Sequence, residues 1–389
     1  RGSAVDEDRG TKAMRSTLRA LRGCTSVAVV TALAAAAPGS AQSETTTPAK
    51  TDSSVSIADD GAVTVDGLTV PVSGLMSPEG AAYLRHLIVD KPFAGGAGPS
   101  DIKADRAFQD RIMLGFLEPM RKRYKVDVVE QRIAGIVADA VTPAGGIAPE
   151  NAHRVLINLH GGGFATGART ASLVESVPLA ALMKIKVVSV DYRMSPEYKF
   201  PAASEDVAAV YRELLKTYRP SQIGIYGCSA GGILTAESIA WFQAHGLPNP
   251  GAIGVFCASL NTLSEGDSAI LAGPLNGMKP FRARPGGEMR PSFRMAYLSD
   301  AKDSDPLAYP QQSPELLAKF PPTLFITGTR SFEFSAALNS HTKLTAAGVE
   351  SQFHGWDGMF HGFFYNSEMP ESREAYAIMV EFFETHLAR

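Results

Sequence analysis

From residue 126 onward, short apolar runs alternate with segments in which apolar residues recur every three or four positions. The short runs predict buried strands, and the three-and-four spacing predicts amphipathic helices. Predicted strands cover 154–159, 186–190, 222–227, 252–259, 323–329 and 351–356, after a pair of strands within 126–143. Predicted helices cover 173–185, 204–218, 231–245, 335–348 and 371–388. This alternation predicts an α/β fold, with a mostly parallel twisted sheet flanked by helices on both faces.

Two further helical patterns, 77–89 and 104–124, precede the sheet, with Ser77 as a predicted N-cap. Because they come before the first strand, we expect residues 73–125 to lie over the sheet as N-terminal cap helices. Residues 261–313 lack a clear period and are rich in Pro and Gly. Residues 126–389 are predicted to form the main domain.

The beginning of the chain has the pattern of a targeting segment. Residues 14–41 open with Met14 and several arginines, continue with an apolar run and end in small residues, which predicts a signal peptide. We therefore expect a secreted or periplasmic protein without a stable membrane anchor, since the apolar run is too short to span a bilayer. An N-terminal anchor or amphipathic segment is the alternative. Residues 1–13 are interpreted as upstream or vector-derived sequence, and 42–72, rich in Ser, Thr, Ala and Asp, as a flexible linker.

Composition excludes some functions. The 389 residues carry a formal net charge of −3, which gives no electrostatic support for a nucleic-acid partner. Only Cys228 and Cys257 follow the predicted signal peptide, so the chain is not a disulfide scaffold. Whether these two cysteines pair is left open.

The strongest chemical signal is a G-x-S-x-G motif at 227–231, between a predicted strand and a predicted helix. In this context the motif forms a sharp turn that projects the hydroxyl of Ser229 above the sheet. A second motif, His-Gly-Gly-Gly at 160–163, also follows a predicted strand. Glycines let backbone N–H groups face a ligand, so Gly162 and Gly163, with Ala230, predict an oxyanion hole. The alternatives are a capped helix and a plain glycine turn.

His361 lies just after the last predicted strand, where this fold places its base. The other histidines fit less well, because His354 falls within a strand, His341 within a helix and His386 at the C-terminal tail. The order Ser, acid, His along the chain is typical of α/β-hydrolases.

Taken together, HGGGF, DYRMSPEYKFPA (191–202), GCSAGG and GTR…GMFHGFF make the chain similar to the hormone-sensitive-lipase-like carboxylesterases, bacterial family IV. The resemblance spans roughly 75–389. It implies the α/β-hydrolase fold, with a helical cap formed by the N-terminal helices and an insertion at about 261–313. It also implies structural roles for 191–193, bracing the loop beside the oxyanion hole. The site residues that it implies are the nucleophile Ser229, the base His361, and an oxyanion hole at Gly161, Gly162, Gly163 and Ala230, supported by His160.

The sequence departs from the family pattern at two positions. Cys228 stands where Asp is common, and we do not expect it to be the nucleophile, because its side chain should point away from Ser229. Ser331 stands where the family places its acidic residue, and a hydroxyl cannot stabilise an imidazolium ion. We predict that Glu333, two residues further on, supplies the carboxylate.

Two other carboxylates remain as alternatives for the acid. Asp357 is close to His361 in sequence, but the first turn after a strand usually directs such a side chain elsewhere. Asp305 lies in the predicted cap insertion.

The predicted function is hydrolysis of short-chain acyl esters through an acyl-enzyme, with a small-molecule ester as substrate. We expect no metal and no organic cofactor, because the sequence has neither a His/Cys cluster at ligand spacing nor a phosphate-binding glycine loop. A non-catalytic ligand-binding homologue, favoured only by Ser331, and a related acyl hydrolase such as a deacetylase, amidase or lipase are the alternatives. A homodimer is left open, because exposed edge strands make one easy to form.

Overall fold

The computed structural model describes residues 55–57, 63–65, 67–90, 101–278 and 295–388. The chain divides into two units, Arg1–Leu68 and Thr69–Arg389. In the first unit, β1 (Val55–Ile57) pairs with β2 (Val63–Val65) in antiparallel fashion. The predicted signal peptide at 14–41 and the 279–294 part of the predicted cap insertion lie outside the described residues.

Within the described residues of the second unit, eight strands form one sheet in the order β10-β9-β8-β7-β5-β6-β4-β3. Strands β10 to β6 run parallel, whereas β4 pairs antiparallel with both β6 and β3. This is the predicted α/β-hydrolase fold, and the apolar runs of the sequence correspond to its strands. The strands are β3 (Val126–Ile133), β4 (Ile136–Pro143), β5 (Val155–Leu159), β6 (Lys186–Val190), β7 (Ile223–Cys228), β8 (Ala252–Phe256), β9 (Thr323–Gly328) and β10 (Ser351–Trp356).

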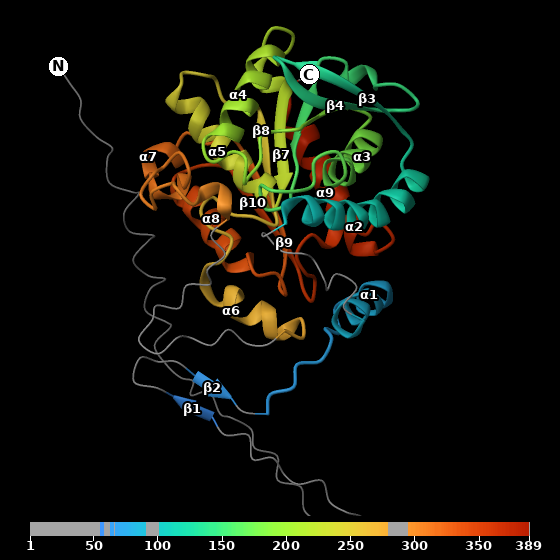
Figure 1. Cartoon of the computed structure of the whole chain (residues 1–389), viewed down its shortest axis with the longest axis vertical. Coiled ribbons are helices and arrows are strands. Elements are labelled where there is room, and N and C mark those ends of the chain that lie inside the picture. Colours follow the sequence, from blue (N-terminus) through green and yellow to red (C-terminus); the bar gives the residue numbers. More distant parts are fainter. Residues whose placement is uncertain (1–54, 58–62, 66, 91–100, 279–294, 389) are drawn as a thin grey trace, which may run out of the picture. The chain divides into compact units, whose positions relative to one another are not determined.

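Helices cover both faces of this sheet, as Figure 1 shows. One face packs against α3, α9 and α2, and the other against α4, α5 and α8. Strand β5 illustrates why, since Ile157 faces one layer and Leu156 the other, and both are fully buried. The helices are α1 (Pro78–Val89), α2 (Ile102–Arg123), α3 (Ala171–Met183), α4 (Ala202–Leu214), α5 (Ala230–Ala244), α6 (Gly266–Leu275), α7 (Pro314–Leu317), α8 (Phe334–Ala346) and α9 (Pro370–His386).

Helix α2 is fastened to the loop that follows β5. The guanidinium of Arg106 donates to the carbonyl of Ala165 at 2.8 Å and forms a two-point ion pair with Glu197 at 2.7 and 2.8 Å. Further along α2, Asp110 accepts from the Thr170 hydroxyl at 2.7 Å. This N-terminal helix therefore borders the glycine loop, and the assignment of 73–125 as a cap stays a prediction. None of the described helices combines the length and the apolarity that crossing a bilayer requires.

Candidate active site

Ser229 occupies the sharp turn between β7 and α5. Its backbone has φ +58° and ψ −123°, a left-handed conformation that is uncommon for a residue with a side chain. The flanking glycines allow it, because a Cβ at Gly227 or Gly231 would lie 2.1 or 1.7 Å from the carbonyl oxygen of Leu159 on β5. The Ser229 N–H donates to the carbonyl of Phe256 at 2.8 Å, which fixes the turn to the end of β8.

The glycine loop after β5 supplies unpaired backbone donors. Gly162 has φ +112°, and a Cβ there would lie 2.3 Å from the carbonyl oxygen of Thr166, so only glycine fits. Its own carbonyl accepts from the N–H of Thr166 at 3.0 Å, which closes the loop. Within the described residues, the N–H groups of Gly162, Gly163 and Ala230 have no protein acceptor. They are available to a ligand oxygen.

Gly161 is different, and its prediction as an oxyanion donor is wrong. Its N–H donates to the carboxylate of Glu175 at 2.9 Å, so it points into the protein interior rather than towards a substrate. The predicted site does not include Glu175. The available signal was its carboxylate, which is the one acidic side chain of the predicted helix 173–185, since a buried acidic residue needs partners.

His361 and Glu333 form a hydrogen-bonded pair, with 2.9 Å between Nδ1 and Oε2. Glu333 is fully buried and also accepts from the hydroxyls of Thr327, at 2.8 Å, and Ser331. Burial raises the pKa of Glu333, but these hydrogen bonds and the positive charge that His361 carries when protonated outweigh it and hold the pKa below its usual range. An ionised carboxylate only accepts, so Nδ1 carries the proton and Nε2 is free to act as a base. The ring of Phe332 stacks on that of His361, with the ring centroids 4.6 Å apart.

The other candidates for the acid lie elsewhere. The Ser331 hydroxyl is 3.5 Å from Nδ1 of His361 and donates to Glu333. Asp357 accepts from Ser73 and from the Thr329 hydroxyl, the latter at 3.0 Å.

Asp305 accepts from the N–H of Leu307 at 2.9 Å. Among the described residues, neither Asp305 nor Asp357 forms a hydrogen bond with His361.

The loops that carry Ser229 and His361 are both anchored to the end of β8. Phe256 accepts from the N–H of Ser229, and the next residue, Cys257, accepts through its sulfur from the N–H of Gly362 at 3.2 Å. No hydrogen bond joins the Ser229 hydroxyl to His361 in the described part of the chain. Such catalytic hydrogen bonds are often long without substrate and shorten when it binds.

His160 packs behind the glycine loop. Its ring stacks on Tyr192 at 4.3 Å, and the Tyr192 hydroxyl donates to the His160 carbonyl at 2.6 Å. Burial lowers the pKa of His160 to about 4, so its ring is neutral near pH 7. Arg193 binds Asp206 at 2.9 Å. These contacts give 191–193 a bracing position at the loop, although the role itself stays a prediction.

Both described cysteines are free thiols buried below the site. Burial raises the pKa of Cys228 well above its ordinary value and also raises that of Cys257, so both stay protonated and neither is an activated nucleophile. Cys257, Glu333 and His361 bring three possible metal ligands within 4.8 Å of one another. Because two of the three already form the acid–base pair, this cluster belongs to the site described above.

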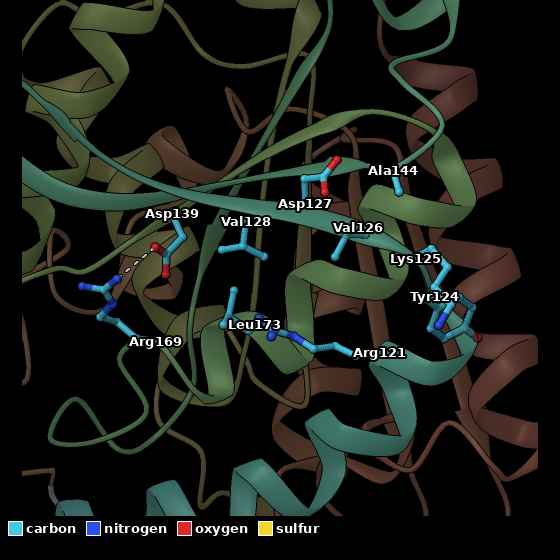
Figure 2. A pocket seen from close by; sticks show the side chains of 10 residues that line it. All are labelled: Arg121, Tyr124, Lys125, Val126, Asp127, Val128, Asp139, Ala144, Arg169 and Leu173. Atoms are coloured by element: carbon cyan, nitrogen blue, oxygen red, sulfur yellow. Dashed lines mark hydrogen bonds and ion pairs between the residues drawn. The ribbon is translucent and has the colours of Figure 1, made fainter.

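A separate groove of about 530 Å³ lies between β3, β4 and the helices α2 and α3. Arg169 pairs with Asp139 at a distance of 3.3 Å. Figure 2 shows this pair at one end of the groove, with Arg121 and Lys125 further along. None of the predicted site residues lines this groove. The candidate active site is the cluster of loops that follow β5, β7, β8, β9 and β10.

Comparisons with known proteins agree on one fold family. A family model described as "alpha/beta hydrolase fold" matches residues 156–365, a range that contains Ser229, Glu333 and His361. An acetyl-hydrolase of Streptomyces hygroscopicus is 30% identical over 240 residues, which cover 60% of this chain and 76% of the relative. An esterase of Acinetobacter venetianus is 26% identical over 254 residues, covering 64% and 80%.

Solved structures show the same likeness. The crystal structure of an esterase named E25 superposes with a TM-score of 0.72 at 26% identity, covering 84% of this chain and 99% of that one. An esterase of the bacterial hormone-sensitive lipase family gives a TM-score of 0.68 at 26% identity, covering 80% and 99%.

Proposed function

Because the chain belongs to the α/β-hydrolase fold family, we propose that it is a serine carboxylesterase acting through Ser229, His361 and Glu333. Its relatives are named esterases and acetyl-hydrolases, and this kinship supports hydrolysis of small-molecule esters. The observation that carries the proposal is the pairing of His361 with a buried, ionised Glu333 at 2.9 Å. The loop that carries His361 is anchored to the same strand end, that of β8, as the strained turn that carries Ser229.

The proposed reaction begins when Nε2 of His361 takes the proton of the Ser229 hydroxyl, whose oxygen then attacks the ester carbonyl. The N–H groups of Gly162, Gly163 and Ala230 stabilise the developing oxyanion, and one such donor is worth about 10²–10³ in rate. Glu333 stabilises the imidazolium ion. His361 then protonates the leaving alcohol, and an activated water releases the acid from Ser229.

We propose short acyl chains as substrates, on the likeness to the hormone-sensitive-lipase-like branch and to an acetyl-hydrolase. We also propose export from the cytoplasm, on the signal-peptide pattern at 14–41. The alternative of a non-catalytic binding protein had its only support in Ser331. The contact between Glu333 and His361 provides a carboxylate where Ser331 does not, which weakens that alternative.

A fluorophosphonate that phosphonylates activated serines tests the proposal. We expect one label per chain, located by peptide mapping on Ser229, and no label in Ser229→Ala. The variant Cys228→Ala is the matched control. It keeps Ser229 in the turn between β7 and α5 and loses only the neighbouring thiol, so it should label fully. Absence of labelling in the wild-type chain, or labelling that persists in Ser229→Ala, would refute the proposal.

A further inference from the structure

A fully buried carboxylate lies below the candidate active site and takes no part in the proposed reaction. Glu175, on α3, accepts four hydrogen bonds. Oε1 accepts from the N–H of Gly161 at 2.9 Å and from the Tyr365 hydroxyl at 2.6 Å. Oε2 accepts from the side-chain amide of Asn158 at 2.9 Å and from the N–H of Cys228 at 3.3 Å.

Three of these four donors belong to the three loops that the proposed reaction uses. Gly161 directly precedes the oxyanion donors, and Cys228 directly precedes the nucleophile. Tyr365 lies four residues after the base, at the end of the short helix Phe363–Tyr365. One carboxylate therefore connects the oxyanion loop, the nucleophile turn and the base loop, which are far apart in the sequence.

Such a group is costly to bury unless its partners are specific. Burial raises the pKa of Glu175 to about 7, although the four hydrogen bonds lower it. The peptide N–H groups of Gly161 and Cys228, like the amide nitrogen of Asn158, can only donate. A carboxylate satisfies all of them, whereas a neutral amide of the same shape would place its own NH₂ against at least one.

We propose that Glu175 is a positioning residue, which holds the oxyanion loop, the nucleophile turn and the base loop in register for catalysis. By drawing the Gly161 N–H inward, it leaves the next donors, on Gly162 and Gly163, free for the substrate oxygen. The inference rests on the proposed esterase function. Because Glu175 touches the loops and not the reacting atoms, its effect should fall on turnover rather than on substrate affinity.

The test compares kcat and KM of Glu175→Gln with those of the wild-type chain. We expect kcat to fall about 10²-fold with KM within about threefold, because displaced donors weaken oxyanion stabilisation. Binding of a trifluoromethyl ketone, whose adduct with the serine carries an oxyanion, should weaken by a similar factor. A group that only stabilised the fold would lower the melting temperature and leave both quantities unchanged in the folded protein.

Glu237→Gln is the matched control. Glu237, on α5, is also fully buried, and burial raises the pKa of its carboxyl well above its usual range, so it is already uncharged. No hydrogen bond in the described part of the chain joins it to the three loops. Its substitution should leave kcat and ketone binding unchanged.

Tyr365→Phe provides a second variant, because it removes one donor to Glu175 and keeps the carboxylate. We expect kcat to fall about fivefold to tenfold with a matching loss of ketone binding. Unchanged kcat and ketone binding in a folded Glu175→Gln would overturn the inference. If that variant fails to fold, unchanged values in Tyr365→Phe would overturn it instead. The esterase proposal fails separately, when wild-type turnover survives in Ser229→Ala.

Discussion

Replacing Glu333 with glutamine removes the negative charge that faces His361 and keeps the size of the side chain. The two groups are 2.9 Å apart and the carboxylate is fully buried, so water screens them little. With an effective dielectric constant of about 20, two unit charges at this distance attract by about 6 kcal/mol. At about 1.4 kcal/mol for each factor of ten, this attraction corresponds to roughly 10⁴ in rate.

The orientation of the new amide cannot restore the loss. If its NH₂ group faces Nδ1, His361 must place its proton on Nε2 and can no longer accept from the nucleophile. If its oxygen faces Nδ1, the imidazolium ion still lacks a charged partner. We therefore expect Glu333→Gln to lower kcat by about 10³–10⁴, with the fold intact.

The assay is the initial rate of p-nitrophenyl acetate hydrolysis, with circular dichroism as a check on folding. Asp357→Asn is the matched control, because Asp357 contacts Ser73 and Thr329 rather than the base. Its turnover should stay within about twofold of wild type. The reasoning is refuted if the two results are exchanged, in which case Asp357 is the acid.

Three further predictions concern the same loops. The double variant Ser331→Asp/Glu333→Gln places a new carboxylate at 331, where the present hydroxyl is 3.5 Å from Nδ1 of His361. Its kcat should be at least tenfold higher than that of Glu333→Gln, and equal kcat values would contradict this. Gly162→Ala should abolish activity and lower the melting temperature, because the new Cβ would lie 2.3 Å from a backbone oxygen. Gly163→Ala meets open space, so its left-handed φ of +63° should lower the free energy of unfolding by only about 1–2 kcal/mol. Equal losses in the two variants would contradict this geometry. Burial raises the pKa of Glu175 from 4.5 to about 7 in the folded chain. Between pH 4.5 and about 7 the folded chain therefore binds more protons than the unfolded chain. The free energy of unfolding should fall by roughly 3 kcal/mol as the pH rises through this range. Calorimetry should show that component missing in Glu175→Gln, and parallel pH curves for the two proteins would contradict it.

Much of the sheet was predictable because its central strands are short apolar runs in the sequence. The run 186–190 coincides with β6, and the two strands predicted within 126–143 are β3 and β4. The spacing of apolar residues did not predict helix α6, since two glycines and Pro274 interrupt any helical period within Gly266–Leu275. The resemblance to the hormone-sensitive-lipase-like family is confirmed by the family match and by the solved esterases.

The sequence also predicted some residues of the candidate site and not others. Motif positions at strand ends located Ser229 and His361, and the choice of Glu333 agrees with the contact that the structure gives it. The assignment of Gly161 failed because its N–H is occupied by Glu175, fourteen residues further along the chain. The lone carboxylate of helix 173–185 indicates that Glu175 needs partners, but which groups it meets depends on how α3 packs below the glycine loop.

The most direct test of the proposed esterase activity is the rate of p-nitrophenyl ester hydrolysis for acyl chains from acetate to palmitate, with Ser229→Ala as the blank. We expect turnover that is highest for short chains and absent from the blank. Equal rates in the wild-type chain and in Ser229→Ala, at every chain length, would contradict it.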